Sequence, residues 1–123
     1  GQIINSPMSA VIGIFEEQYK KRKPLTIVKP GTQKRDFTHI NDIVRGCYLA
    51  WKKGNQNDYM LGTKKNYSII EIAKMFKSKI KYISSRPGER FGSTIPNNNA
   101  KNILGYKPTL DIKDYIRDFL SRN

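Results

Sequence analysis

The chain has 123 residues, of which 37% are hydrophobic and 27% charged, and its formal net charge is +13. The apolar content excludes a disordered chain, and the length fits one domain or part of a larger one. The single cysteine excludes an internal disulfide and favours a reducing, cytoplasmic location. The longest apolar run, residues 10–15, is too short to cross a bilayer, so no membrane partner is expected.

The positive charge raises the question of an anionic partner. Sixteen of the 23 basic residues are lysines, and Asn and Ile are also abundant, a joint bias that A/T-rich coding explains. The lysines come without zinc-finger spacing, an arginine-rich helix or a glycine-aromatic RNA-binding signature. A basic nucleic-acid-binding module is therefore the alternative hypothesis, and a small anionic ligand would benefit from the same charge.

The first predicted element is a helix over residues 8–22, in which apolar side chains recur at helical spacing. Ser6 is the favoured cap, with Pro7 suited to the first helical position, and Ser9 is the weaker alternative. Pro24 is expected to stop this helix.

Two strands and a second helix are predicted next. β-Branched content predicts a strand over residues 25–28, and alternation predicts another over residues 36–40. Asn41 or Asp42 then caps a helix that Gly54 closes. Apolar residues on this helix, including Cys47, would form core or domain-contact surface, and a thiol on such a face is expected to be inert.

The second half of the chain continues the alternation. We expect a strand over residues 58–61, a helix opened by a capping box of Ser68 and Glu71, and a strand over residues 80–83.

The last two predicted elements are helices. Residues 97–104 form a short helix that ends at Gly105. An amphipathic helix follows, starting at Thr109 or Asp111. Together the patterns predict one mixed α/β unit over residues 1–123, with short strands and four to five helices.

Two short motifs carry the chemistry, Arg35-Asp36-Phe37-Thr38-His39-Ile40-Asn41-Asp42 and Arg86-Pro87-Gly88-Glu89. A guanidinium makes paired, planar hydrogen bonds to phosphate oxygens that lysine cannot make. Pro87 restricts Arg86 to an extended backbone, and Gly88 lets the chain pass close to a ligand. An ionised carboxylate such as that of Glu89 is an acceptor suited to a sugar diol. The motifs therefore predict a site for a nucleoside diphosphate.

Other polar residues are interpreted as structural. His39, the only histidine, has no companion nucleophile or metal-ligand cluster, so we interpret it as packed near a helix cap. Asp42 suits the first turn of a helix, and Asp36 is expected to anchor the loop around Arg35. Arg90 is a second candidate for the same anion.

In this order, the segments resemble the carboxy-terminal, substrate-binding part of NAD-dependent nucleotide-sugar epimerases and dehydratases. These enzymes are extended short-chain dehydrogenases/reductases, UDP-glucose 4-epimerase among them. The turn Lys29-Pro30-Gly31 departs from the family's usual Gly-Asp/Asn-Gly. The resemblance rests on the two motifs above and on further segments: Leu25-Thr26-Ile27-Val28-Lys29-Pro30-Gly31-Thr32-Gln33, Tyr59-Met60-Leu61-Gly62-Thr63, Tyr67-Ser68-Ile69-Ile70-Glu71-Ile72-Ala73 and Lys101-Asn102-Ile103-Leu104-Gly105-Tyr106-Lys107-Pro108.

The resemblance implies a role for each candidate site residue. Arg35 and Arg86 would contact the diphosphate of a UDP- or dTDP-sugar, and Glu89 would accept hydrogen bonds from the ribose hydroxyls. The strand that carries Thr26 and Val28 would lie along the base. The complete enzyme would oxidise the sugar at C4 with NAD and then epimerise it or eliminate water.

The resemblance also implies what this chain lacks. Its sequence contains no glycine-rich dinucleotide-binding turn, and its two Tyr-x-x-x-Lys matches, Tyr19 to Lys23 and Tyr48 to Lys52, fall in predicted helices of the substrate-binding part. We therefore expect no catalytic residue, metal or bound NAD in this chain alone. Expected partners are a nucleotide sugar, the NAD-binding half and, for the full enzyme, a second subunit. A non-catalytic docking domain, revealed by self-association, is the third hypothesis.

Overall fold

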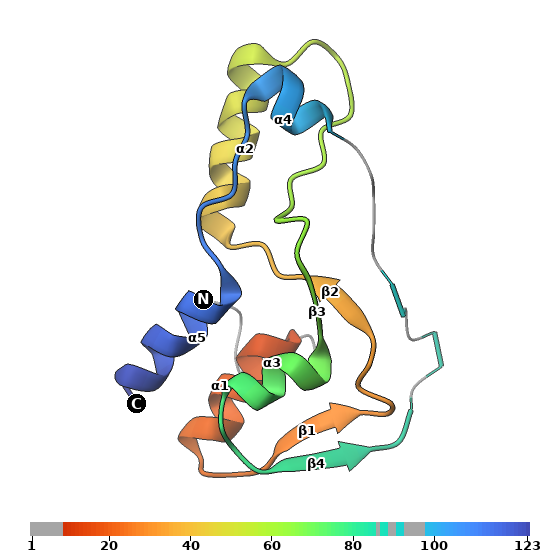
Figure 1. Ribbon diagram of the computed structural model, residues 1–123, viewed down its shortest axis with the longest axis vertical. Coiled ribbons are helices and arrows are strands. Elements are labelled where there is room, and N and C mark those ends of the chain that lie inside the picture. Colours follow the sequence, from red (N-terminus) through yellow and green to blue (C-terminus); the bar gives the residue numbers. More distant parts are fainter. Residues whose placement is uncertain (1–8, 86, 89–90, 93–97) are drawn as a thin grey trace.

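The computed structural model describes residues 9–85, 87–88, 91–92 and 98–123, and Figure 1 shows their arrangement. The described residues form five helices and four short strands, as the mixed α/β prediction requires. The elements are α1 (Val11–Lys20), β1 (Leu25–Val28), β2 (Lys34–Asp36), α2 (Ile40–Lys53), β3 (Asn66–Ser68), α3 (Ile69–Met75), β4 (Ile80–Ile83), α4 (Asn99–Leu104) and α5 (Ile112–Ser121).

The strands form two separate pairs. β1 and β4 are parallel, with Leu25 opposite Ile80 and Val28 opposite Ile83. β2 and β3 are antiparallel, with Arg35 opposite Tyr67. The predicted bounds of β1 and β4 are confirmed at both ends, because Pro and Gly punctuate the first strand and β-branched residues fill both.

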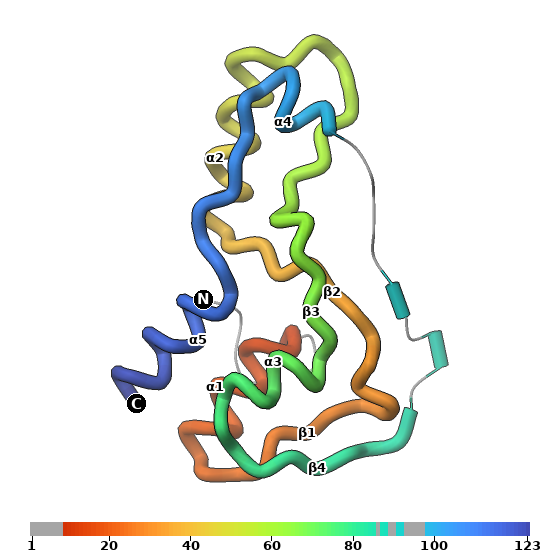
Figure 2. The backbone as a smooth tube through the Cα atoms, in the orientation of Figure 1, coloured from red at the N-terminus to blue at the C-terminus, as the bar shows by residue number. Residues whose placement is uncertain are grey.

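The molecule is elongated and has two apolar clusters. Helices α1, α3 and α5 pack around β1, burying Phe15, Ile27 and Phe76 completely. A smaller cluster lies between α2 and α4, where Leu104 and Tyr106 are buried. Figure 2 shows extended stretches of chain running between these two ends. No helix among the described residues is long and apolar enough to cross a membrane.

The caps of three later helices follow the sequence signals. Ser68 and Glu71 form the predicted capping box, with 2.7 Å between the Ser68 amide and Glu71 Oε2. Hydrogen bonds from Ser68 lower the pKa of the Glu71 carboxyl. Gly105 ends α4 in the left-handed conformation, with φ of 66°. Asp111, the second of the two proposed residues, caps α5 by accepting a hydrogen bond from the Lys113 amide at 2.9 Å.

The ends of α1 differ from the prediction. The helix begins at Val11 with Ala10 as its N-cap, so Ser9 does not cap it, and the residues at positions 6–8 lie outside those described. It ends at Lys20, and the chain turns through Arg22, whose φ is 52°. The helix therefore ends before Pro24 is reached.

The predicted strand over residues 36–40 was wrong beyond its first residue. β2 ends at Asp36, and α2 begins at Ile40. His39 is the N-cap of α2, in place of Asn41 or Asp42, because its Nδ1 accepts the Asn41 amide at 3.1 Å. The imidazole thus caps the helix N-terminus, a role that short polar side chains such as those of Asp, Asn and Ser usually fill.

The predicted strand over residues 58–61 is also absent, whereas β3 was not predicted. Among the described residues, this segment has no neighbouring strand to pair with. It packs instead beneath α2 at Gly46, where an added Cβ would lie 2.5 Å from Leu61 Cδ2. A strand pattern needs a partner to become a strand.

Candidate functional site

Three stretches of chain converge at the carboxyl ends of β1 and β4. The Lys29 amide donates to the Ile83 carbonyl at 3.0 Å, and Gln33 Nε2 donates to the Val28 carbonyl at 3.2 Å. The Lys34 amide donates to the Phe91 carbonyl at 3.1 Å. We name this region, from Val28 and Ile83 to Lys34 and Phe91, the strand-end junction. In open α/β sheets, the carboxyl ends of parallel strands are where ligands bind.

Arg35 lies at this junction on β2. Its side chain is partly exposed, and Nη1 donates to the Lys34 carbonyl at 2.8 Å. A guanidinium carries five N–H donors in a fixed plane, and this bond to the backbone helps to orient the group.

The structure treats the two predicted residues of β1 differently. Val28 lies at the junction, partly exposed. Thr26 is tied to α1 by Gln18, whose Oε1 accepts the Thr26 amide at 2.9 Å and whose Nε2 donates to Thr26 Oγ1 at 2.8 Å. The structure thus brings Arg35 and Val28 to one region and holds the Thr26 side chain against α1.

The other predicted contacts, Arg86, Glu89 and the alternative Arg90, lie outside the described residues. Gly88, which is described, has a φ of 78°. An added Cβ there would meet no described heavy atom within 4 Å. The backbone conformation therefore requires glycine at this position, independently of any ligand.

Asp36, next to Arg35, fastens a distant segment to β2. Its carboxylate accepts hydrogen bonds from Thr63 Oγ1 at 2.7 Å, the Thr63 amide at 3.1 Å, the Lys64 amide at 3.0 Å and Thr38 Oγ1 at 2.9 Å. Asp36 is thus an anchor, as predicted, but the segment it holds lies 27 residues away along the chain. The Gly-Thr pair at residues 62–63 is the only local signal of this contact.

Asp42 makes the second long-range clamp. Its buried carboxylate accepts the amides of Thr109 and Leu110 at 3.0 to 3.1 Å and pairs with Arg45 Nη2 at 2.7 Å. Burial would raise the pKa of Asp42, but hydrogen bonds from Leu110 and Thr109 and the charge of Arg45 outweigh it and lower the pKa. The carboxylate lies in the first turn of α2, as expected, and it also joins that turn to the segment before α5, which was not predicted.

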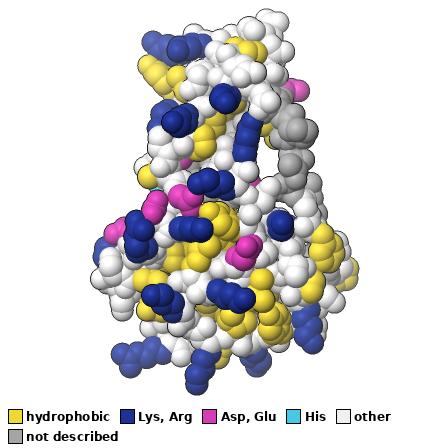
Figure 3. Space-filling view, in the orientation of Figure 1, with side chains coloured by type: hydrophobic (Ala, Val, Ile, Leu, Met, Phe, Trp, Pro, Cys, Tyr) yellow, Lys and Arg dark blue, Asp and Glu magenta, His cyan; other side chains and the backbone are white. Residues whose placement is uncertain are grey.

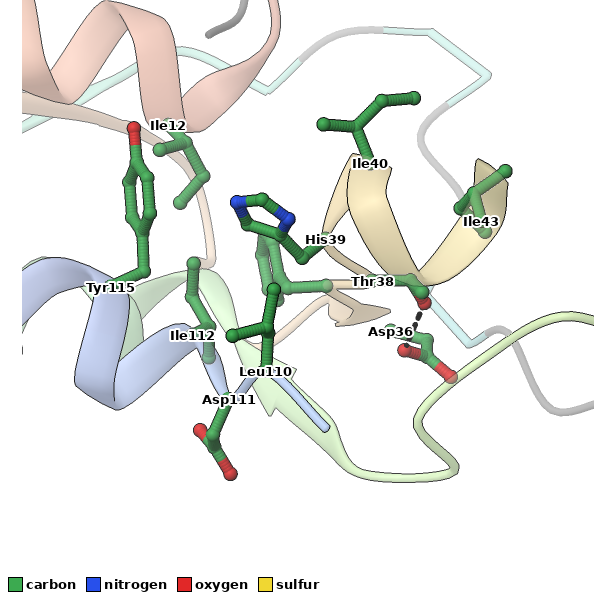
Figure 4. A pocket seen from close by; sticks show the side chains of 11 residues that line it. Ile12, Asp36, Thr38, His39, Ile40, Ile43, Leu110, Asp111, Ile112 and Tyr115 are labelled. Atoms are coloured by element: carbon green, nitrogen blue, oxygen red, sulfur yellow. Dashed lines mark hydrogen bonds between the residues drawn. The ribbon is translucent and has the colours of Figure 1, made fainter. Parts of the chain in front are cut away.

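His39 lies beside a largely apolar cavity of about 390 Å³ (Figure 4). Its ring is 6.0 Å from that of Tyr115, whose hydroxyl donates to Glu16 at 2.5 Å. Burial and this hydrogen bond raise the pKa of Tyr115 to about 12, so the phenol stays neutral. Among the described residues, no group of three His, Cys, Asp or Glu could hold a metal. His39 thus lies where the structural interpretation places it, at the N-cap of α2 and packed near Tyr115.

One face of α2 is apolar and exposed. Ile40, Val44 and Tyr48 are each more than half exposed, and Trp51 is 77% exposed. We name these four residues the α2 stripe. Cys47 is exposed on the same helix, so this apolar face, expected to be core or domain-contact surface, is not core among the described residues. Ile40 also lines the cavity beside His39, which makes the two features continuous.

Comparison with known proteins shows which family the chain resembles. The model of the NAD-dependent epimerase/dehydratase family matches residues 4–62. UDP-glucuronate 4-epimerase of Thermodesulfobacterium geofontis is 32% identical over 111 residues, which are 85% of this chain and 33% of that protein. The chain therefore resembles the NAD-dependent epimerase/dehydratase family over most of its length.

Further relatives match most of the chain. UDP-glucuronic acid decarboxylase 3 of Arabidopsis thaliana is 24% identical over 120 residues, covering 93% of this chain and 35% of the relative. UDP-glucuronic acid 4-epimerase of Bacillus cereus, solved with UDP-4-deoxy-4-fluoro-glucuronic acid and NAD, superposes with a TM-score of 0.81 and 28% identity. That match covers 96% of this chain and 41% of the solved one. The chain therefore spans about a third of the length of these curated relatives.

Proposed function

We propose that this chain is the nucleotide-sugar-binding part of an epimerase or decarboxylase of the family, and that it holds the diphosphate of a UDP-sugar. The observation that carries the proposal is the strand-end junction. Ile83 precedes Arg86 and Glu89 and is bonded beside Val28, whereas Phe91 follows them and is bonded beside Arg35. The segment before the second motif is thus held at the end of β1, and the segment after it is held at the start of β2, beside Arg35.

Each candidate residue has a distinct task in this proposal. Arg35 and Arg86 hold the diphosphate oxygens through paired, charge-assisted hydrogen bonds. Glu89 accepts the ribose hydroxyls. Val28 lies along the base, and Thr26 supports it within the same strand, since Gln18 holds both the hydroxyl and the amide of Thr26. Relatives named for UDP-glucuronic acid favour UDP over dTDP as the nucleotide.

The described residues do not fit NAD. In the dinucleotide-binding motif, a strand leads through a glycine-rich turn into a helix whose first amides hold the pyrophosphate. Here β1 leads through Pro30 and Gly31 to β2, and β4 leads to the stretch that ends at Phe91. We propose that NAD is held by a part of the protein beyond this chain. The reaction on the sugar then belongs to that part, and this chain positions the substrate.

Replacing Arg35 with alanine is expected to weaken UDP binding by more than about tenfold, through loss of a charge-assisted hydrogen bond to phosphate. Arg86→Ala should act similarly, and Arg35→Lys should recover only part of the affinity because lysine lacks the planar fork. Amide chemical shifts during titrations with UDP, GDP and dTDP give both the affinity and the location of binding.

Arg117→Ala is the matched control, because Arg117 is 78% exposed and pairs only with Asp114 on α5. Its affinity for UDP should equal that of the parent chain. If UDP binds with unchanged affinity to both Arg35→Ala and Arg86→Ala, the site assignment is wrong.

We further propose that the NAD-binding part of the protein covers the α2 stripe. An apolar, aromatic strip of this length seldom stays exposed on a monomer. The strand-like residues 58–61 pack beneath α2 and find no neighbouring strand among the described residues, so a sheet edge from the other part could pair with them. Self-association is disfavoured, because each copy carries a formal charge of +13.

Trp51 provides a direct test of docking, because it is the only tryptophan and lies on the stripe. Adding a separate NAD-binding polypeptide of the family should shift its fluorescence to shorter wavelength as water leaves the indole. Tyr48→Ala should weaken this docking by about tenfold, since aromatic anchors carry much of an interface's energy. Lys53→Ala, at the end of the same helix, should leave it unchanged. A shift that depends on the concentration of this chain alone would instead indicate self-association.

A further inference from the structure

A concave basic surface lies at the opposite end of the molecule from α2. Because β1 and β4 are parallel and begin side by side, the turns that precede them are neighbours. Between the turns is a cleft of about 590 Å³. Figure 3 shows lysine and arginine side chains gathered along this lower end. We name it the basic cleft, after five cations that line it: Lys20, Arg22, Lys23, Lys77 and Lys79.

These cations are not neutralised by carboxylates of the described residues. The acids nearest in sequence, Glu17 and Asp118, pair with Lys21 and Arg122 respectively, and neither of those cations lines the cleft. Lys20 extends over the Phe119 ring, 5.4 Å from its centroid. The cleft therefore keeps a concentrated positive charge that the fold itself does not use in ion pairs.

The negative carboxyl ends of helices favour nearby cations, but they account for only part of the positive charge in the cleft. α1 and α3 both finish here, and each carboxyl end carries roughly half a negative charge, against five full positive charges. The last carbonyls are already satisfied by backbone amides. The Lys23 amide donates to the Gln18 carbonyl at 2.8 Å, and the Lys77 amide donates to the Lys74 carbonyl at 3.1 Å. The five side chains are thus not needed to close the helices.

Both turns also place a cation in the left-handed backbone region, with φ of 52° at Arg22 and at Lys77. Glycine adopts this conformation at lower cost, so the residue type is not dictated by the turn. Each residue lies one position past a helix C-cap, where the left-handed conformation commonly ends a helix. Here the two strained residues face the same cleft.

We infer that the basic cleft binds a small anion carrying several phosphate groups, at a site separate from the strand-end junction. Its volume is that of a small-molecule site, and lysine ammonium groups with one guanidinium suit clustered phosphate oxygens. Single-stranded nucleic acid would need an aromatic platform for its bases. Tyr19 is the aromatic residue of the cleft, and its ring packs against Phe76 and Phe119, 6.2 and 5.8 Å between centroids.

The test is a titration of the chain with inorganic tripolyphosphate, followed by amide chemical shifts. We expect saturable binding, with shifts confined to residues 20–24 and 77–79. A variant with Lys23→Gln and Lys79→Gln should bind at least about tenfold more weakly, through loss of two charge-assisted contacts. A matched variant with Lys52→Gln and Lys53→Gln, which removes the same charge from α2, should change affinity less than about twofold.

Three outcomes would overturn the inference. Equal weakening in both double variants would mean that net charge, not the cleft, attracts the anion. Competition by saturating UDP would place tripolyphosphate at the strand-end junction. Measuring UDP binding by the Lys23→Gln, Lys79→Gln variant tests the strand-end junction separately from the basic cleft. Tighter, strongly salt-dependent binding of a random oligonucleotide would identify nucleic acid as the ligand.

Discussion

Replacing Asp42 with asparagine is expected to lower the free energy of unfolding by about 3 kcal/mol. The buried carboxylate, which pairs with Arg45 and accepts backbone amides, would be replaced by a neutral amide. The asparagine amide would place N–H donors where one carboxylate oxygen now accepts the Thr109 and Leu110 amides. Arg45 would lose its carboxylate partner at the same time, while keeping its hydrogen bonds to the Lys107 carbonyl and Thr109 Oγ1. Denaturant unfolding of the two proteins measures the difference.

The effect should depend on pH in a defined direction. The pKa of Asp42 is lowered in the folded state, so the carboxylate's contribution is fully present above the ordinary aspartate pKa. It is lost as pH falls through the lowered value. The stability difference between the parent and Asp42→Asn should therefore be constant near neutral pH and shrink below about pH 4.

Asp114→Asn is the matched control, because Asp114 also lies in the first turn of a helix and pairs with an arginine three residues later. That pair is exposed, so its loss should cost less than about 0.5 kcal/mol. Equal losses in the two variants would show that Asp42 stabilises α2 only through the helix dipole, not by clamping the segment before α5.

Features that depend on near neighbours could be predicted from the sequence. Strands β1 and β4 are short β-branched runs, the first bounded by proline on either side. The capping box of Ser68 and Glu71 is complete within four residues, and Gly105 ends its helix through its own backbone freedom. Each of these signals acts over one turn of chain, where propensity and hydrogen bonding decide the structure.

Features set by partners far away along the chain could not be predicted from the sequence. Asp42 and the Thr109 amide are 67 residues apart, and nothing in the local pattern links them. Apolar spacing predicted α2 but not which way its apolar face points, and Trp51 is exposed. Residues 58–61 have the composition of a strand, yet a strand exists only when another backbone accepts its hydrogen bonds.

The same distinction between local and long-range features applies to the residues of the candidate site. The sequence motif predicted Arg35 as a phosphate contact, which stays a prediction, and the structure places Arg35 on β2. The capture of Thr26 by Gln18 joins two elements and depends on how α1 packs over the strand edge. The hydroxyl of a strand residue is available to a ligand only if no side chain of a neighbouring helix already forms a hydrogen bond with it.

Replacing Gly62 with alanine is expected to destabilise the fold by about 2 kcal/mol, because the new Cβ would lie 2.6 Å from Asp36 Oδ2. Four hydrogen bonds fix that carboxylate, so it cannot move aside without releasing the segment at residues 63–64. Gly92→Ala should cost much less, because no described heavy atom lies within 4 Å of a Cβ there.

A double-mutant cycle separates crowding from backbone effects. In an Asp36→Ala background the carboxylate is gone, so Gly62→Ala should cost less than about 0.5 kcal/mol, and the two changes should be strongly non-additive. Unfolding free energies of the four proteins give the coupling directly. If Gly62→Ala costs the same in both backgrounds, the glycine is required by its own backbone conformation. Strong coupling would mean that Asp36, next to Arg35, holds the distant segment in place only because residue 62 has no side chain.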